Sequence, residues 1–99
     1  MPRRRHRNPH HGSDFNDFLR EDGLEAQATA LALKAVISAA LTKRMKTHTL
    51  TVSALARRIE TSRAVVQRAL DPGNTALTLR TLCRLTAALE CRIYLSIEA

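Results

Sequence analysis

The sequence predicts an all-α domain of five helices, followed by a single β-strand. Between residues 13 and 90, apolar side chains recur at spacings of three and four, which is typical of amphipathic helices. A Ser or Thr precedes several of these stretches, where a helix N-cap is expected. After residue 90 the apolar period falls to two. The 99 residues suit one small domain, which we divide into a basic arm (1–12), a helical domain (13–90) and a C-terminal strand (91–99).

The first two predicted helices are separated by Gly23. Ser13 is placed as an N-cap, and Gly23 is placed to end the helix that it begins. The second helix starts near Leu24, runs to about Lys46 and has two apolar faces, which predicts that it is sandwiched. One face is expected on the following helices, and the other on the first helix or on a second subunit. The faces are Ala26, Ala30, Leu33, Ile37, Ala40 and Leu41, and Leu24, Ala28, Leu31, Ala35 and Ala39.

Three shorter helices follow, each with a predicted N-cap. Thr51 precedes a helix that ends at Ile59, Ser62 precedes 63–70, and Thr78 precedes 79–90. Asp71-Pro72-Gly73 is expected to stop the middle helix. The inner faces of the outer two helices are predicted to be Val52, Leu55, Ala56 and Ile59, and Leu82, Leu85 and Leu89.

The chain ends in a stretch of alternating residues that predicts a half-buried strand. One strand cannot satisfy its own backbone groups, so we expect the same strand of a second subunit to pair with it, antiparallel about Leu95. Ile93 then faces Ile97, and Arg92 faces Glu98, which is a favourable cross-strand pair. The alternative is an extended segment that packs on the core.

The composition narrows the classes of partner. A formal net charge of +7 and a pI of about 10.7 suit a polyanion, either nucleic acid or an anionic membrane surface. No uninterrupted apolar run approaches the ~18–20 residues that cross a bilayer, so we expect no membrane.

Cys83 and Cys91 fit reduced core residues of a cytosolic protein better than a disulfide or a metal site. We expect no metal or cofactor, since the histidines lie far from both cysteines in sequence.

The stretch "VSALARRIETSRAVVQRA", residues 52–69, predicts a helix-turn-helix. Its two short helices are joined by a tight turn, and Ala56 is small enough for the helices to cross closely. On a helical wheel, Ser62, Ala69 and Leu70 fall within about 60° of Val66 and are predicted to face inward.

The opposite side of this second helix is predicted to be a polar outer face. It consists of Arg63, Ala64, Gln67 and Arg68. Arg can bridge guanine, Gln can bridge adenine, and Ala can touch a thymine methyl group. A solvated face with a few Arg is the alternative interpretation, but the turn, the small crossing residue and the caps favour base reading from the major groove.

The basic residues are concentrated in the part of the chain that contains the predicted helix-turn-helix. From Lys43 to Arg68 there are seven Lys or Arg and one acidic residue, Glu60, which is typical of a surface that faces phosphates. The backbone N–H groups at Val52 and Arg63 begin helices, and helix N-termini bind phosphate.

Residues 37–90 resemble the Xre/Cro-repressor type of helix-turn-helix domain, with four helices in the same order. The resemblance implies a lambda-repressor-like fold and a dimeric repressor that reads double-stranded DNA. By position, Arg63, Ala64, Gln67 and Arg68 match the base-facing sites of its recognition helix, 62–70. Thr51, Ser62 and Asn74 match backbone-contacting or capping sites.

Three positions depart from the family's usual pattern. Glu60 and Glu90 stand where Gly is usual, so a left-handed backbone there would be strained. Val52 stands where a Gln often reaches a phosphate.

The sequence therefore favours a cytoplasmic, nucleoid-associated transcriptional regulator. Arg3, Arg4 and Arg5 belong to a predicted disordered arm that either follows the DNA or only adds charge. No catalytic constellation is evident, so we do not expect an enzyme. Few aromatic residues are available for stacking single strands. The alternative function is an antitoxin that represses its own operon and covers a small toxin with residues 13–40 and the terminal strand.

Overall fold

The computed structural model describes residues 12–99, with side chains from residue 23 onward. Four helices are present in this part of the chain: α1 (Gly12–His48), α2 (Val52–Arg58), α3 (Arg63–Leu70) and α4 (Leu79–Ala88). The predicted all-helical character is confirmed. The predicted arm lies almost wholly outside the described residues, as do the side chains of Ser13 and of the first predicted helix.

The prediction of five helices was wrong, because the first two form one continuous helix of 37 residues. Gly23 lies inside α1, and apart from its chain neighbours and the adjacent helix backbone no described atom lies within 4 Å of the place where its Cβ would stand. A glycine inside a helix costs only about 1 kcal/mol relative to alanine. No proline or competing cap accompanies it, so nothing ends the helix there.

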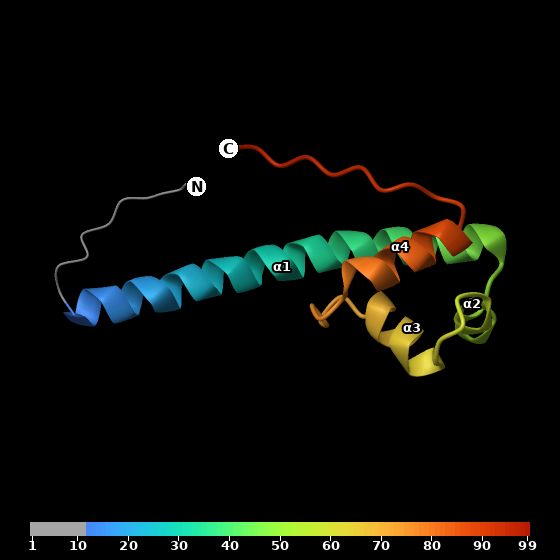
Figure 1. Ribbon diagram of the computed structural model, residues 1–99, viewed down its shortest axis with the longest axis horizontal. Helices are drawn as coiled ribbons and strands as arrows, with labels where there is room; N and C mark the ends of the chain where they lie inside the picture. The colour runs from blue at the N-terminus through green and yellow to red at the C-terminus, as the bar shows by residue number, and fades with distance from the viewer. Residues whose placement is uncertain (1–11) are drawn as a thin grey trace.

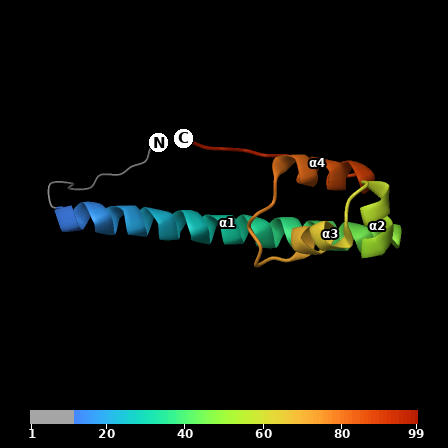
Figure 2. The same cartoon turned by 60° about the horizontal axis from the view of Figure 1, so that its bottom comes forward.

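The long helix α1 determines the shape of the molecule, which measures 55 × 26 × 19 Å. In both views, α2, α3 and α4 gather at the C-terminal end of α1, while its N-terminal half extends beyond them (Figures 1 and 2). The chain therefore has a compact head and a projecting rod.

The core lies within the head, where the end of α1 packs on the other three helices. Leu55, Val66, Leu85 and Leu89 are fully buried at its centre. This confirms the predicted inner faces, although Val52 and Leu82 pack only at the edge. Among the side chains from residue 23 onward, the buried apolar set is Leu41, Met45, Leu55, Ala56, Ile59, Val66, Ala69, Leu85 and Leu89.

All three predicted N-caps of the short helices are confirmed. The side-chain oxygen of Thr51 accepts a hydrogen bond from the Ala54 N–H at 3.0 Å. Thr78 accepts one from the Thr81 N–H at 3.1 Å, and Ser62 caps α3 in the same way. Each cap satisfies one of the backbone donors that a helix start leaves unpaired.

Three helices end in a left-handed residue that is not glycine. The φ angles are 54° at Thr49, 57° at Glu60 and 56° at Glu90. At Glu60 the N–H donates to the Arg57 carbonyl, and the next N–H, that of Thr61, donates to the Ala56 carbonyl at 2.9 Å. This is a Schellman motif, which usually has glycine at the left-handed position. The suspected strain at Glu60 and Glu90 is therefore present in the backbone.

Four cationic side chains bind carbonyl oxygens at the C-terminal ends of α2, α3 and α4. The Arg44 guanidinium donates to the carbonyls of Leu89 and Glu90, each at 2.9 Å. Arg58 also donates to the end of α4, Arg84 donates to the Ile59 carbonyl at the end of α2, and Lys34 binds the end of α3. Cations at helix C-termini are favoured by the helix dipole.

The C-terminal tail contains no strand in this structure. Residues 92–99 are exposed and have no regular secondary structure. A strand requires a neighbour to accept and donate its backbone hydrogen bonds, and the rest of this chain presents no sheet edge among the described residues. The alternative of a tail packed on the core also fails beyond Cys91, which does pack against it.

By length and hydropathy alone, Gly23–His48 is long and apolar enough to cross a membrane. The prediction did not identify this segment because it considered only uninterrupted apolar runs. The same helix carries the buried Lys34 and Ser38, and its end supplies Leu41 and Met45 to the core. A core helix of a soluble domain passes the same test, so this finding is weak evidence for a membrane.

Candidate nucleic-acid interface

Helices α2 and α3 form the helix-turn-helix that the sequence predicts. They are joined by the four residues 59–62 and pack directly on one another. Ala56 is 3% exposed and Ala69 is 2% exposed, so small side chains occupy the contact on both helices. Leu55 and Val66 anchor the pair to the core. The short turn and this double anchorage fix the direction in which α3 presents its outer face.

The outer face of α3 carries the four residues that the wheel predicted. Arg63, Ala64, Gln67 and Arg68 are all exposed, whereas Val66 is fully buried. The donors of two guanidinium groups and one amide therefore lie on one surface with a small apolar side chain between them. This surface can form paired hydrogen bonds with base edges, in the geometry that a helix in the major groove requires.

Ser62 departs from the wheel prediction, because its side chain is exposed and does not face the core. Its hydroxyl oxygen accepts a hydrogen bond from the Val65 N–H at 3.2 Å. The wheel treated Ser62 as a helical position, but an N-cap has an extended backbone, here with ψ of 157°. Ser62 therefore shapes the start of α3, next to Arg63.

Thr51 and Asn74 each accept a backbone hydrogen bond within their own segment of the chain. Thr51 is exposed as the cap of α2. The Asn74 side-chain oxygen accepts a hydrogen bond from the Ala76 N–H at 2.9 Å, which orders the loop after α3. Both were predicted as backbone-contacting or capping residues, and the structure supports a helix cap for Thr51 and a loop-ordering hydrogen bond for Asn74.

Lys34 is a residue of this site that sequence reasoning missed. Its side chain is 3% exposed, and its ammonium group donates to three carbonyl oxygens, those of Arg68, Asp71 and Asn74, at 3.0, 2.7 and 2.6 Å. Burial lowers the pKa of Lys34, and the nearby Asp71 carboxylate opposes that shift. These bonds fasten the end of the recognition helix and the following loop to α1.

One turn along α1, Ser38 adds a second contact to the same end of α3. Its hydroxyl donates to the Ala69 carbonyl at 3.4 Å, and the side chain is 3% exposed. No sequence signal marks either contact, since Lys34 and Ser38 lie more than thirty residues from their partners. A lysine within a largely apolar stretch indicates only that its charge needs polar partners if it is buried, and it does not identify them.

The cationic residues in and around the helix-turn-helix divide into two groups. Arg44 and Arg58 are engaged with the carbonyls at the end of α4, so they contribute to the fold. The predicted phosphate-facing charge therefore depends on exposed side chains elsewhere, which are Lys43, Lys46, Arg57, Arg63, Arg68 and Arg80. Fewer cationic side chains are therefore free to face phosphates than the sequence suggests, but both arginines of α3 are among them.

Two other groups of predicted residues belong to the ends of the chain. Arg3, Arg4 and Arg5 lie outside the described residues. The predicted dimer contacts lie in the exposed tail, at Arg92, Ile93, Leu95, Ile97 and Glu98.

Cys83 is exposed and Cys91 half-buried, and both thiols are free, so the prediction that both are core residues fails for Cys83. Within the described chain, no three His, Cys, Asp or Glu side chains are grouped as metal ligands.

Comparison with known proteins agrees with the geometry of the head. A family model of the Cro/C1-type HTH DNA-binding domain matches residues 40–94, which is more than half of the chain. The chain belongs to this family. No curated protein and no solved structure matches the sequence significantly.

The family match and the structure divide the chain at nearly the same place. The matched Cro/C1-type domain begins at residue 40, within the last third of α1, and includes α2, α3 and α4. The resemblance to Xre/Cro-type domains is thereby confirmed, and with it DNA binding as the property of this family. Residues 12–39 of α1, which include the rod, lie before the matched part.

Proposed function

We propose that this protein is a sequence-specific, double-stranded DNA-binding transcriptional regulator that acts as a dimeric repressor. The observation that carries the proposal is the exposed row of Arg63, Ala64, Gln67 and Arg68 on a helix whose opposite side is anchored in the core. A helix held in this way can place its first two turns in the major groove. Base readout then comes from these side chains.

Contacts to phosphates are expected to flank the recognition helix. Arg57 is exposed at the end of α2, and the N-terminus of α3 presents backbone N–H groups beside Ser62. Thr51 and Asn74 are proposed to support these backbone contacts. Arg3, Arg4 and Arg5 are proposed to add affinity that does not depend on sequence, because arginine-rich arms bind phosphates or the minor groove.

A dimer is part of the proposal because repressors of this kind bind two half-sites about one helical turn of DNA apart. The exposed tail is one candidate for the contact between the copies. Its predicted register pairs Ile93 with Ile97 and Arg92 with Glu98 about Leu95, and all five side chains are accessible in the single chain. Pairing of two tails would supply the backbone partners that each tail lacks.

The antitoxin remains a second candidate because the rod exposes apolar side chains that a small toxin would cover. Leu24, Leu33 and Val36 are 64%, 54% and 69% exposed. A small toxin gene beside this gene, and a stable complex of the two products, would favour this function. Repression of the shared operon would be common to both functions.

The proposed function is tested by DNA binding with the purified protein. We expect the protein alone to shift its own promoter DNA in a gel at low salt, and repeated selection from random DNA to converge on one operator with two related half-sites. The affinity should fall steeply with salt, since Lys and Arg contacts release counterions. Absence of any shift at low salt, or selection without convergence, would contradict the proposal.

A further inference from the structure

A stripe of small and apolar residues runs along one side of α1, from the part before the family-matched residues to the edge of the head. Its first four members recur at spacings of four, three and four, and the fifth follows seven residues later, which is the repeat that brings one side of a helix to a partner helix. Leu24 is 64% exposed and Leu31 is 39% exposed, so none of the side chains from residue 23 onward covers the N-terminal part of the stripe. The members are Leu24, Ala28, Leu31, Ala35 and Thr42.

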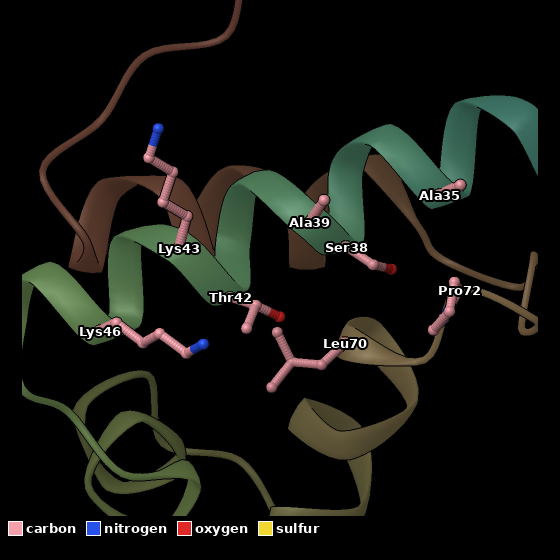
Figure 3. A pocket seen from close by; sticks show the side chains of 8 residues that line it. All are labelled: Ala35, Ser38, Ala39, Thr42, Lys43, Lys46, Leu70 and Pro72. Atoms are coloured by element: carbon pink, nitrogen blue, oxygen red, sulfur yellow. The ribbon is translucent and has the colours of Figure 1, made fainter.

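At its C-terminal end the stripe runs into a groove between α1 and the end of α3. The groove has a volume of about 430 Å³. Figure 3 shows Leu70 pointing toward Thr42 across it, with Pro72 at one end and Lys46 reaching toward the other. The lining is Ala35, Ser38, Ala39, Thr42, Lys43, Lys46, Leu70 and Pro72.

The exposed leucines and the groove cannot meet within one chain. Both belong to the same straight helix, and Leu24 precedes the first groove residue, Ala35, by three turns of α1. A second copy that runs antiparallel can bring its Leu24 to this groove. The two-fold axis then lies at the level of residue 34 of each α1 helix, and the same contact occurs twice, so the assembly closes as a dimer.

The charges along α1 fit this antiparallel arrangement. The sequence before and around Leu24 is acidic, with Glu21, Asp22 and Glu25, whereas Lys43 and Lys46 border the groove. Glu25 and Lys43 are both exposed and lie on the same side of the stripe, eighteen residues or five turns apart. In an antiparallel pair, Glu25 of each copy therefore approaches Lys43 of the other, whereas a parallel pair would bring like charges together.

We propose that a second copy of this chain is the occupant of the stripe and groove, through an antiparallel pairing of the two α1 helices. The leucine at position 24 of each copy fills the groove of the other, and Glu25 pairs with Lys43 across the interface. This surface supplies the dimer on which the proposed repressor function rests. The heads then lie toward opposite ends of the helix pair, so the register of α1 sets the spacing of the two recognition helices.

The experiment is sedimentation equilibrium of the full chain without DNA, at protein concentrations around 10 µM. We expect a dimer for the natural sequence. Leu24→Asp should raise the dissociation constant at least ~100-fold, because the symmetric interface buries this side chain twice. Leu33→Asp is the matched control, since Leu33 is also exposed but lies nine residues, or two and a half turns, from Leu24 and thus on the opposite side of α1. It should leave the dimer intact.

A charge exchange tests the direction of the helices. Glu25→Lys should weaken the dimer several-fold at low salt, and adding Lys43→Glu to the same chain should restore it, because each copy then carries the exchanged pair. Restoration needs the two residues to face one another, so a variant that merely unfolds α1 would not be rescued. Helix content by circular dichroism should stay unchanged in all variants.

Four results would overturn the inference. They are a monomer in the natural sequence, an unchanged dimer in Leu24→Asp, equal dissociation by Leu33→Asp, and dissociation by Leu95→Asp in the tail without an effect of Leu24→Asp. Binding of a monomer to lipid vesicles through the same stripe would also contradict it. DNA binding distinguishes this failure from failure of the proposed function, since a monomeric variant should still prefer an operator half-site to scrambled DNA.

Discussion

Replacing Glu60 with glycine should stabilise this protein. Glu60 occupies the left-handed position of the turn between α2 and α3, with φ of 57°. That conformation costs a residue with a Cβ about 1–2 kcal/mol, and glycine adopts it without steric cost. Glycine also gains freedom in the unfolded chain, which takes back roughly 0.5–1 kcal/mol. The net gain in the free energy of unfolding is therefore about 0.5–1 kcal/mol.

The assay is thermal unfolding followed by circular dichroism. For a domain of this size, Glu60→Gly should raise the melting temperature by roughly 2–8 °C. Glu60→Ala is the matched control, because it also removes the carboxylate but keeps the Cβ, so it should bring no comparable gain. Glu90→Gly, at φ of 56°, should behave like Glu60→Gly. Equal stability of Glu60→Gly and Glu60→Ala would refute backbone strain as the cause.

Two further substitutions test other contacts of the fold. Lys34→Met roughly keeps the length of the side chain but removes the ammonium donor that the carbonyls of Arg68, Asp71 and Asn74 share. It should therefore lower the free energy of unfolding by about 1–3 kcal/mol in a urea titration, and an unchanged midpoint would contradict the anchoring role. Thr78→Ala removes the cap of α4 and should cost about 1 kcal/mol, whereas Thr78→Ser should cost little.

The features that the sequence predicted correctly are local. An N-cap such as Thr78 and its partner lie three residues apart, so the signal and the structure occupy the same short window. The inner and outer faces of α3 follow from helical period alone, which is why Val66 and Gln67 were assigned correctly. Glu60 and Glu90 were identified as positions of strain because the family's pattern supplied the expected glycines.

The features that were missed depend on distant partners or on small energies. Lys34 meets its acceptors 34 to 40 residues away, which no local pattern encodes. Gly23 was expected to end a helix, but its cost in a helix is too small to do so without a second signal. The tail alternates like a strand, yet a strand forms only when another chain or segment offers its backbone groups.

The most direct measurement of the central claim compares base discrimination by variants of the recognition helix. On a selected operator and its single-base variants, Arg63→Ala and Gln67→Ala should each lose about 1–3 kcal/mol of discrimination at one base position. Arg5→Ala, which lies in the arm, should weaken binding to all sequences alike. Equal losses on the operator and on scrambled DNA for all three variants would contradict base reading by α3.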